Sequence, residues 1–89
     1  MKLEEIRKQI DAIDIQIVTL LARRFALVKK SALAKKQNGR PISDKNRENE
    51  VLQNVSKQAT NVKENLFLIK LYKFIIKESL QIQQKSYGN

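Results

Sequence analysis

The apolar residues in the first part of the chain recur at alternating intervals of three and four positions. They are Leu3, Ile6, Ile10, Ile13, Ile17, Leu20, Leu27 and Ala34. This spacing puts them on one face of an α-helix, and no Gly or Pro interrupts the pattern before Gly39. We therefore predict one continuous amphipathic helix of about 35 residues, about 50 Å long. Because the rest of the chain is too short to cover such a helix, the pattern favours a partner chain.

A turn should follow this helix. Residues 37–41 contain a glycine that can end a helix, Gly39, and the only proline, Pro41. Ser43 or Asp44 can then cap a short second helix, which should fade in the polar stretch 57–61. Its apolar side is formed by Val51, Leu52 and Val55.

A third helix should begin between residues 62 and 64. It contains the dense apolar run 66–69, and short apolar runs are also compatible with a strand, here over residues 66–76. The pattern continues through Gln83 with Lys and Glu interspersed, which favours a helix. We therefore expect an all-α fold of three helices, the first very long, in a single domain spanning residues 1–89.

The composition removes several kinds of chemistry. The chain has no cysteine and no histidine, which excludes disulfides, thiol nucleophiles, imidazole bases and the usual zinc ligands. We therefore expect no metal or redox chemistry. The net charge of +9, from 18 basic and 9 acidic residues, raises nucleic acid or an anionic membrane as partners. The basic residues are spread along the whole chain, however, as on a solvated surface.

The distribution of apolar residues predicts neither an export signal at the N-terminus nor a membrane span. The N-terminus lacks an uninterrupted apolar segment, and no stretch reaches the ~20 apolar residues that a membrane span needs. The sequence therefore predicts a cytoplasmic protein with no membrane partner.

Polar residues interrupt the apolar stripe of the first helix at Arg24 and Ser31. A guanidinium in such a stripe is costly unless an anion meets it, although Arg24 could also pair with a core carboxylate or reach the surface. Lys35 follows Arg24 by almost three helical turns, so both project from one face, roughly 16 Å apart along the axis. Arg7 lies about 25 Å from Arg24 on the same helix. It could join one small-anion site with Arg24 only from a second, antiparallel copy.

The other polar candidates are ambiguous when each is taken alone. Asp44 is expected to cap the second helix and Glu48 to be a surface acid. Ser79 and Gln83 are four residues apart and share a face of the third helix, where isolated polar residues are usually exposed to solvent.

Taken in order, these positions resemble the all-helical family of chorismate mutases, which occur alone or fused to the N-terminus of prephenate dehydratases. The matching segments are IRKQIDAIDIQIVTLLARR at 6–24, the following Lys35, GRPISDKNRE at 39–48 and IIKESLQIQQ at 75–84. The resemblance implies an intertwined homodimer with two sites, each receiving one arginine from the opposite protomer. It also implies the Claisen rearrangement of chorismate to prephenate in phenylalanine and tyrosine biosynthesis, without nucleophile, metal or cofactor.

The resemblance assigns carboxylate binding to three arginines, Arg24, Arg47 and Arg7 of the other chain. Guanidinium groups suit this role because they contact carboxylates in a bidentate manner. Ser79 would add a hydrogen bond near one carboxylate.

Further residues match positions that act on the reacting part of the substrate. By resemblance, Lys35 and Gln83 contact the ether oxygen and should affect rate more than binding. Glu48, with the backbone near Asp44, would accept the ring hydroxyl.

Other functions compete with this one. An isochorismate-pyruvate lyase would share the fold and much of the cationic site, but Glu48 and Ser79 favour the mutase. An aminodeoxychorismate mutase also stays open, whereas a catalytically silent relative is disfavoured because every matched position is present. A basic helical module for nucleic acid would bind in a strongly salt-dependent manner. That function explains neither Arg24 nor the Ser79 and Gln83 pair.

Overall fold

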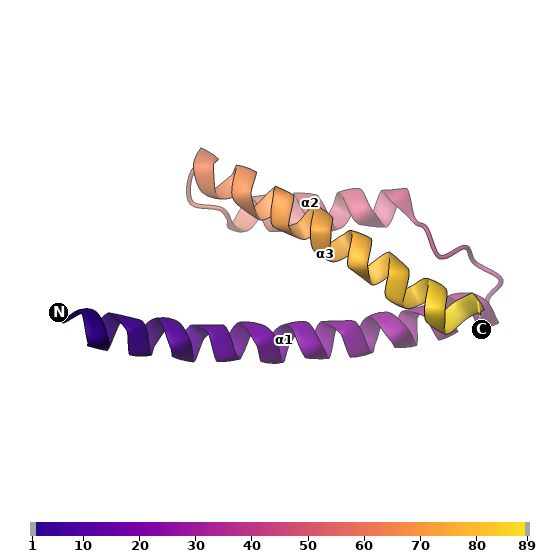
Figure 1. The fold of residues 1–89 in the computed structure, drawn as a ribbon. Coiled ribbons are helices and arrows are strands. Elements are labelled where there is room, and N and C mark those ends of the chain that lie inside the picture. The colour runs from indigo at the N-terminus through magenta and orange to yellow at the C-terminus, as the bar shows by residue number, and fades with distance from the viewer. Residues whose placement is uncertain (1, 89) are drawn as a thin grey trace.

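The computed structural model describes residues 2–88, and these residues form three helices joined by two short connections. The helices are α1 (Leu3–Gln37), α2 (Lys45–Gln58) and α3 (Val62–Gly88) (Figure 1). The all-α fold with one very long N-terminal helix is confirmed. The strand alternative for residues 66–76 is wrong, because this stretch lies inside α3.

The connection between α1 and α2 is set by local backbone chemistry at both ends. Gly39 has φ of 65°, a conformation that glycine adopts without strain. Its N–H donates to the Lys36 carbonyl at 3.3 Å, and the Arg40 N–H donates to the Lys35 carbonyl at 2.8 Å. These two bonds satisfy carbonyls that the end of a helix leaves free. At the other end the Asp44 side chain accepts from the Arg47 N–H at 3.0 Å and caps α2.

The first turn of α3 is fixed in a related way. The Asn61 side chain accepts from the Glu64 N–H at 2.8 Å, and the Glu64 carboxylate accepts from the Thr60 N–H at 3.3 Å. Hydrogen bonds from the Thr60 hydroxyl and backbone lower the pKa of Glu64 and keep it charged. A negative charge here also interacts favourably with the N-terminal end of the helix dipole.

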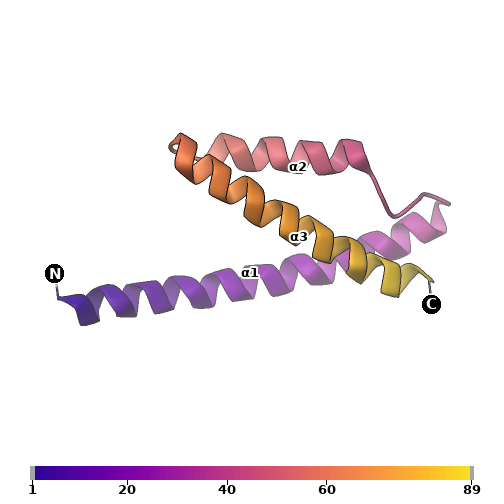
Figure 2. The same ribbon diagram turned by 45° about the horizontal axis from the view of Figure 1, so that its top comes forward.

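α3 packs against both other helices. It forms a hairpin with α2 and crosses α1 in the C-terminal half of that helix (Figure 2). The buried positions lie around this crossing and include two apolar residues, Ala32 and Ile75, and two polar ones, Ser79 and Gln83. The fold therefore concentrates its few buried side chains where α1 and α3 meet.

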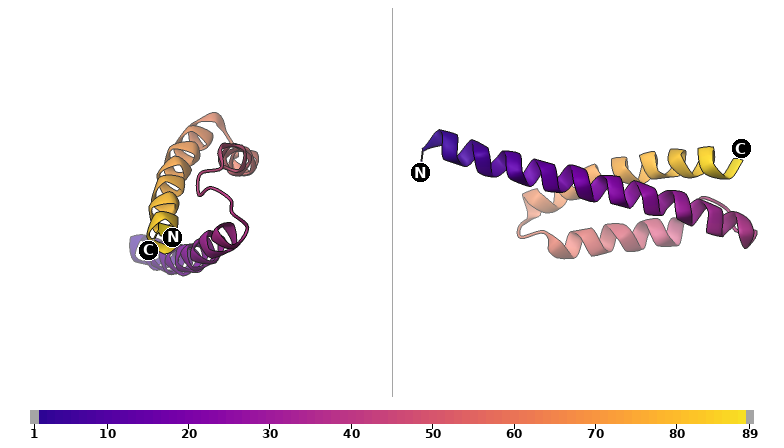
Figure 3. Two further views of the ribbon diagram at one scale, coloured as in Figure 1. Left: turned by 90° about the vertical axis from the view of Figure 1, so that its right-hand side faces the viewer. Right: turned by 90° about the horizontal axis from the view of Figure 1, so that it is seen from below.

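The N-terminal end of α1 extends beyond the other two helices (Figure 3). Every residue from 2 to 20 is exposed, including the apolar stripe predicted from the sequence. The chain measures 55 × 26 × 14 Å and its radius of gyration is 16.2 Å, whereas a compact chain of this length would have about 12 Å. A single chain thus leaves a long apolar helix face uncovered. Within residues 2–88, no helix is both long enough and apolar enough to cross a membrane.

Candidate active site

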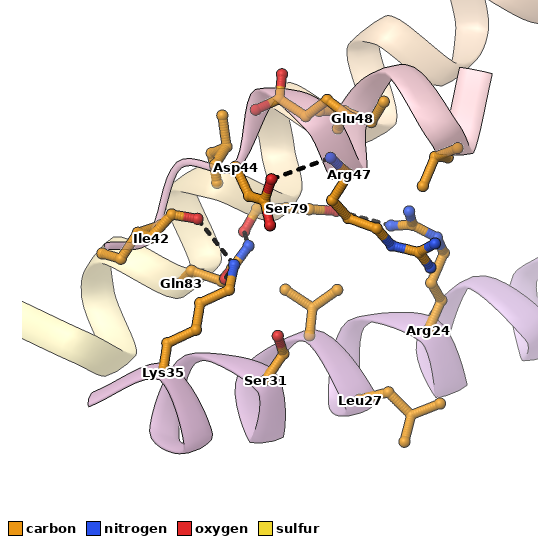
Figure 4. Close-up of a pocket in the computed structure, with 14 residues that line it drawn as sticks. Arg24, Leu27, Ser31, Lys35, Ile42, Asp44, Arg47, Glu48, Ser79 and Gln83 are labelled. Atoms are coloured by element: carbon orange, nitrogen blue, oxygen red, sulfur yellow. Dashed lines mark hydrogen bonds between the residues drawn. The ribbon is translucent and has the colours of Figure 1, made fainter. Parts of the chain in front are cut away.

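All three helices contribute to a cavity of about 330 Å³ beside the crossing of α1 and α3. This volume lies at the lower end of the range of small-molecule pockets. Its polar lining consists of Arg24, Ser31, Lys35, Asp44, Arg47, Glu48, Ser79 and Gln83. Its apolar lining consists of Leu27, Val28, Ile42, Val51, Ile76 and Leu80. Figure 4 shows the cationic side chains of Arg24, Lys35 and Arg47 pointing into this space from α1 and α2.

Arg24 is oriented by side chains of α3. Its Nη1 donates to the Ser79 hydroxyl at 2.8 Å (Figure 4). This hydroxyl in turn donates to the Ile75 carbonyl at 2.7 Å. The guanidinium carbon also lies 5.8 Å from the centre of the Tyr72 ring, within the range of a cation–π interaction. Because both partners are neutral, Arg24 keeps its full charge for an anion in the cavity.

Lys35 is held by two acceptors from different parts of the chain. Its Nζ donates to the Ile42 carbonyl at 2.8 Å and to Gln83 Oε1 at 2.7 Å (Figure 4). An ammonium group has three N–H donors, so one remains for a ligand. Gln83 is only 7% exposed, and its Nε2 makes a long contact of 3.5 Å to the Ser79 carbonyl. This amide N–H is therefore weakly engaged and can serve a second acceptor.

The first turns of α2 bring one cation and two carboxylates to the cavity. Asp44 is engaged in capping α2, and Arg47 pairs with Glu50 on the exposed face of the helix. One oxygen of Glu48 lies 3.6 Å from the Lys45 ammonium. The other, Oε2, is buried and has no hydrogen-bond partner among the described residues. A buried acceptor without a donor is costly, so this oxygen is ready for a hydroxyl of a ligand.

The lining residues carry three positive and two negative formal charges, so the cavity favours an anion. Within residues 2–88, no three His, Cys, Asp or Glu side chains gather closely enough to hold a metal ion. The arrangement is suited to binding and orienting an organic anion, because two of its three cations, Arg24 and Lys35, are fixed before any ligand arrives.

Arg7 is absent from this cavity. It lies near the start of α1, where it is exposed and contacts Glu4 at 3.4 Å. Because α1 is one continuous helix, Arg7 stays about 25 Å from Arg24 along its axis. The chain alone cannot bring the two guanidinium groups to one small ligand.

Comparison with known proteins identifies the family of this chain. Residues 6–84 match the family described as chorismate mutase type II. The chain belongs to this family. It is 40% identical over 86 residues to a chorismate mutase of Methanocaldococcus jannaschii, an alignment that covers 94% of this chain and 86% of the relative.

A second relative combines two activities in one protein. It is the bifunctional chorismate mutase/prephenate dehydratase of Buchnera aphidicola subsp. Schizaphis graminum, 40% identical over 82 residues. The alignment covers 89% of this chain but only 21% of that protein. As a member of the chorismate mutase type II family, the chain is an isomerase of aromatic amino acid biosynthesis. These comparisons do not favour the lyase, aminodeoxychorismate or nucleic-acid alternatives.

The structure brings seven of the eight residues to which the resemblance gives a role to one cavity and leaves Arg7 outside it. The solvent-facing interpretation of Ser79 and Gln83 is wrong, because both are buried. Glu48 is likewise not a fully exposed surface acid, since its side chain is only 21% exposed.

Two further residues contribute to the site and were not predicted from the sequence. The Ile42 carbonyl holds Lys35, and a backbone carbonyl has no signature in the sequence. The Tyr72 ring faces Arg24, and it could have been found from its position seven residues, or two helical turns, before Ser79.

Proposed function

We propose that the cavity is the active site in which this chain rearranges chorismate to prephenate, as one domain spanning residues 1–89 and as a homodimer. The observation that carries the proposal is the convergence of Arg24, Lys35 and Arg47 with the buried amide of Gln83 in one small cavity. Chorismate carries two carboxylates, an ether oxygen and a ring hydroxyl. The cavity offers a suitable polar group for each of these.

Arg24 and Arg47 would bind the carboxylates, together with Arg7 of the partner subunit. The Ser79 hydroxyl, which accepts from Arg24, fixes the direction of that guanidinium. Two ligand charges would exceed the net charge of the lining by one, so a third arginine from the partner makes the charges match. This charge balance supports a shared site.

Lys35 and Gln83 would act on the ether oxygen. In the rearrangement the bond between this oxygen and the ring carbon breaks while a carbon–carbon bond forms within the same molecule. Negative charge builds up on the oxygen as the bond breaks. The free N–H of Lys35 and the weakly engaged N–H of Gln83 would stabilise this charge more in the transition state than in the ground state. These two residues therefore determine rate.

The unpartnered Oε2 of Glu48 would accept a hydrogen bond from the ring hydroxyl. The backbone near Asp44, at the start of α2, would lie next to this contact. Apolar side chains such as Val28, Val51 and Leu80 would pack on the ring and hold the compact conformer in which the enolpyruvyl group lies over it. No proton transfer and no cofactor are needed for the step.

The homodimer is supported by the surface that one chain leaves exposed. The accessible surface is 7380 Å², about 2,000 Å² more than a compact monomer of this mass would expose. The apolar side chains that contribute to it lie along α1 and on the first half of α3, and they include Leu3, Ile10, Ile13, Leu20, Leu66, Phe67 and Phe74. An excess of this size matches the area that obligate dimers bury. We further propose that the enzyme acts in the cytoplasm.

The direct test is to incubate the purified protein with chorismate, and separately with isochorismate, and to identify the products. We expect prephenate from chorismate without release of pyruvate. Pyruvate from isochorismate as the main product would instead assign the site to the lyase reaction. Sedimentation velocity on the same sample should give a mass of two chains.

A further inference from the structure

The last turns of α3 present three polar side chains at intervals of four residues. Ser79, Gln83 and Tyr87 therefore share one face of the helix. Ser79 accepts from Arg24 and Gln83 accepts from Lys35, so the first two members orient the cations of the cavity. The Tyr87 hydroxyl donates to the Arg40 carbonyl at 3.0 Å. The third member thus reaches the connection between α1 and α2 rather than a cation.

This connection, residues 38–44, forms one end of the cavity through Ile42 and Asp44. Its ends are fixed by the helix termini at Gly39 and Asp44. Between them, two backbone carbonyls accept from side chains outside the connection. The Arg40 carbonyl accepts from Tyr87 of α3, and the Ile42 carbonyl accepts from Lys35 of α1.

We propose that Tyr87 is a positioning residue, which ties the connection 38–44 to α3 and thereby fixes the Ile42 carbonyl that aims the Lys35 ammonium. Lys35 is bound between the Ile42 carbonyl on the connection and Gln83 on α3. Its remaining N–H keeps one direction only if these two acceptors keep their separation. Tyr87 lies one helical turn beyond Gln83 and joins the same two elements, so it holds that separation constant.

The consequence concerns rate rather than binding, and it rests on the proposed function. Small errors in the position of a catalytic group are costly, because the stabilisation of developing charge depends on geometry. Arg24, which would bind a carboxylate, is oriented by α3 without the connection. Loosening residues 38–44 should therefore disturb the action of Lys35 on the ether oxygen more than the binding of the carboxylates.

The test is the Tyr87→Phe variant of the full chain, which loses the hydroxyl and keeps the ring. We expect kcat for chorismate to fall by roughly three- to tenfold, the factor that corresponds to one neutral hydrogen bond, while KM stays within about twofold of the parent value because carboxylate binding is not altered. Hydrogen exchange, followed by mass spectrometry, should become faster in residues 40–44 and remain unchanged in α1 before residue 30.

The matched control is Ser86→Ala, which removes a hydroxyl from the same turn of α3. Ser86 is not one of the side chains that bond to the carbonyls of the connection, so we expect neither kcat nor exchange in residues 40–44 to change. An unchanged kcat in Tyr87→Phe, a raised KM with normal kcat, or faster exchange throughout the chain would each overturn the positioning role. If the parent protein does not convert chorismate, the proposed function fails. The exchange of residues 40–44 then still decides whether Tyr87 ties the connection.

Discussion

At the scale of single residues, two of the three cations in the cavity are oriented by neutral partners. Arg24 is held by a hydroxyl and an aromatic ring, and Lys35 by a backbone carbonyl and an amide. A carboxylate partner would fix these side chains equally well but would cancel their charge. Neutral partners leave the charge available for a bound anion, at a geometry set before binding.

Replacing Lys35 by Ala should therefore affect catalysis far more than folding. We expect kcat to fall by about 100- to 1000-fold, as when a single donor to a developing oxyanion is removed. The dimer should remain folded, because the Lys35 side chain contacts the cavity rather than the apolar face of α1. Steady-state kinetics and circular dichroism on the same preparation measure both effects.

Lys36 provides the control for this variant. It is the next residue of α1, it is exposed, and it does not line the cavity. Lys36→Ala removes the same positive charge from the same turn and should leave kcat within about twofold, since exposed charges are strongly screened. Near-normal turnover in Lys35→Ala would contradict the assignment of the site.

Tyr72 allows the orientation of Arg24 to be tested without removing the arginine. Tyr72→Leu removes the aromatic face and should raise KM by about two- to fivefold, the factor expected for a partly exposed cation–π contact. Tyr72→Phe keeps the face and should retain most of the affinity. An equal KM in the two variants would show that the ring acts only by filling space.

Much of the site could be predicted from the sequence, through interruptions of the apolar pattern, through the spacing of polar residues and through the resemblance to the family. Arg24 was found because it interrupts an apolar stripe. Ser79 and Gln83 drew attention through their spacing, yet their burial was not predictable, because it depends on how α3 crosses α1. The role of Ile42 could not be predicted, because the residue binds Lys35 through its backbone carbonyl and its side chain only lines the cavity.

At the scale of elements, prediction succeeded because each helix is bounded by local chemistry. α1 ends where Gly39 adopts a positive φ, and α2 begins where Asp44 caps it. These interactions involve residues no more than five positions apart, so they can be recognised without knowing the fold. The apolar run of α3 is ambiguous when a short window is considered alone. The longer pattern predicts a helix, as the structure shows.

The end of α1 should be sensitive to the backbone at Gly39. A Cβ at this position would meet nothing within 4 Å, so substitution has no steric cost beyond the backbone itself. We expect Gly39→Ala to lower the free energy of unfolding by about 1–2 kcal/mol, the cost of a left-handed conformation for an L-residue. Urea titrations at one fixed protein concentration measure this change, because the stability of a dimer depends on concentration.

Asparagine offers a graded comparison at the same position, since it tolerates positive φ better than alanine does. Gly39→Asn should therefore lie between the parent and Gly39→Ala in stability. Equal stability of all three proteins would mean that the connection can adopt another conformation at no cost.

At the scale of the whole molecule, the sequence predicts a partner chain from one long apolar stripe. The apolar stripe of α1 continues over residues that no other part of the chain covers. The same long helix separates Arg7 from Arg24. Association with a second chain would therefore both cover the stripe and complete the proposed site. An antiparallel second copy of α1 would satisfy both requirements through one two-fold axis.

Subunit mixing tests this coupling. In the proposed dimer each site uses Arg24 of one chain and Arg7 of the other, so Arg7→Ala and Arg24→Ala dimers should each be nearly inactive. A mixed dimer would have one site with both arginines and one site with neither. After random exchange of equal amounts, half of the dimers are mixed, and we expect roughly a quarter of the parent turnover per chain.

As a control, each variant is taken alone through the same exchange procedure. Neither variant alone should regain activity. Native mass spectrometry on differently labelled chains establishes that mixed dimers form. Recovery requires Arg7 and Arg24 to meet across the interface, because within one chain they remain about 25 Å apart on a rigid helix. If mixed dimers form without regaining activity, the shared site is wrong even if the dimer itself is present.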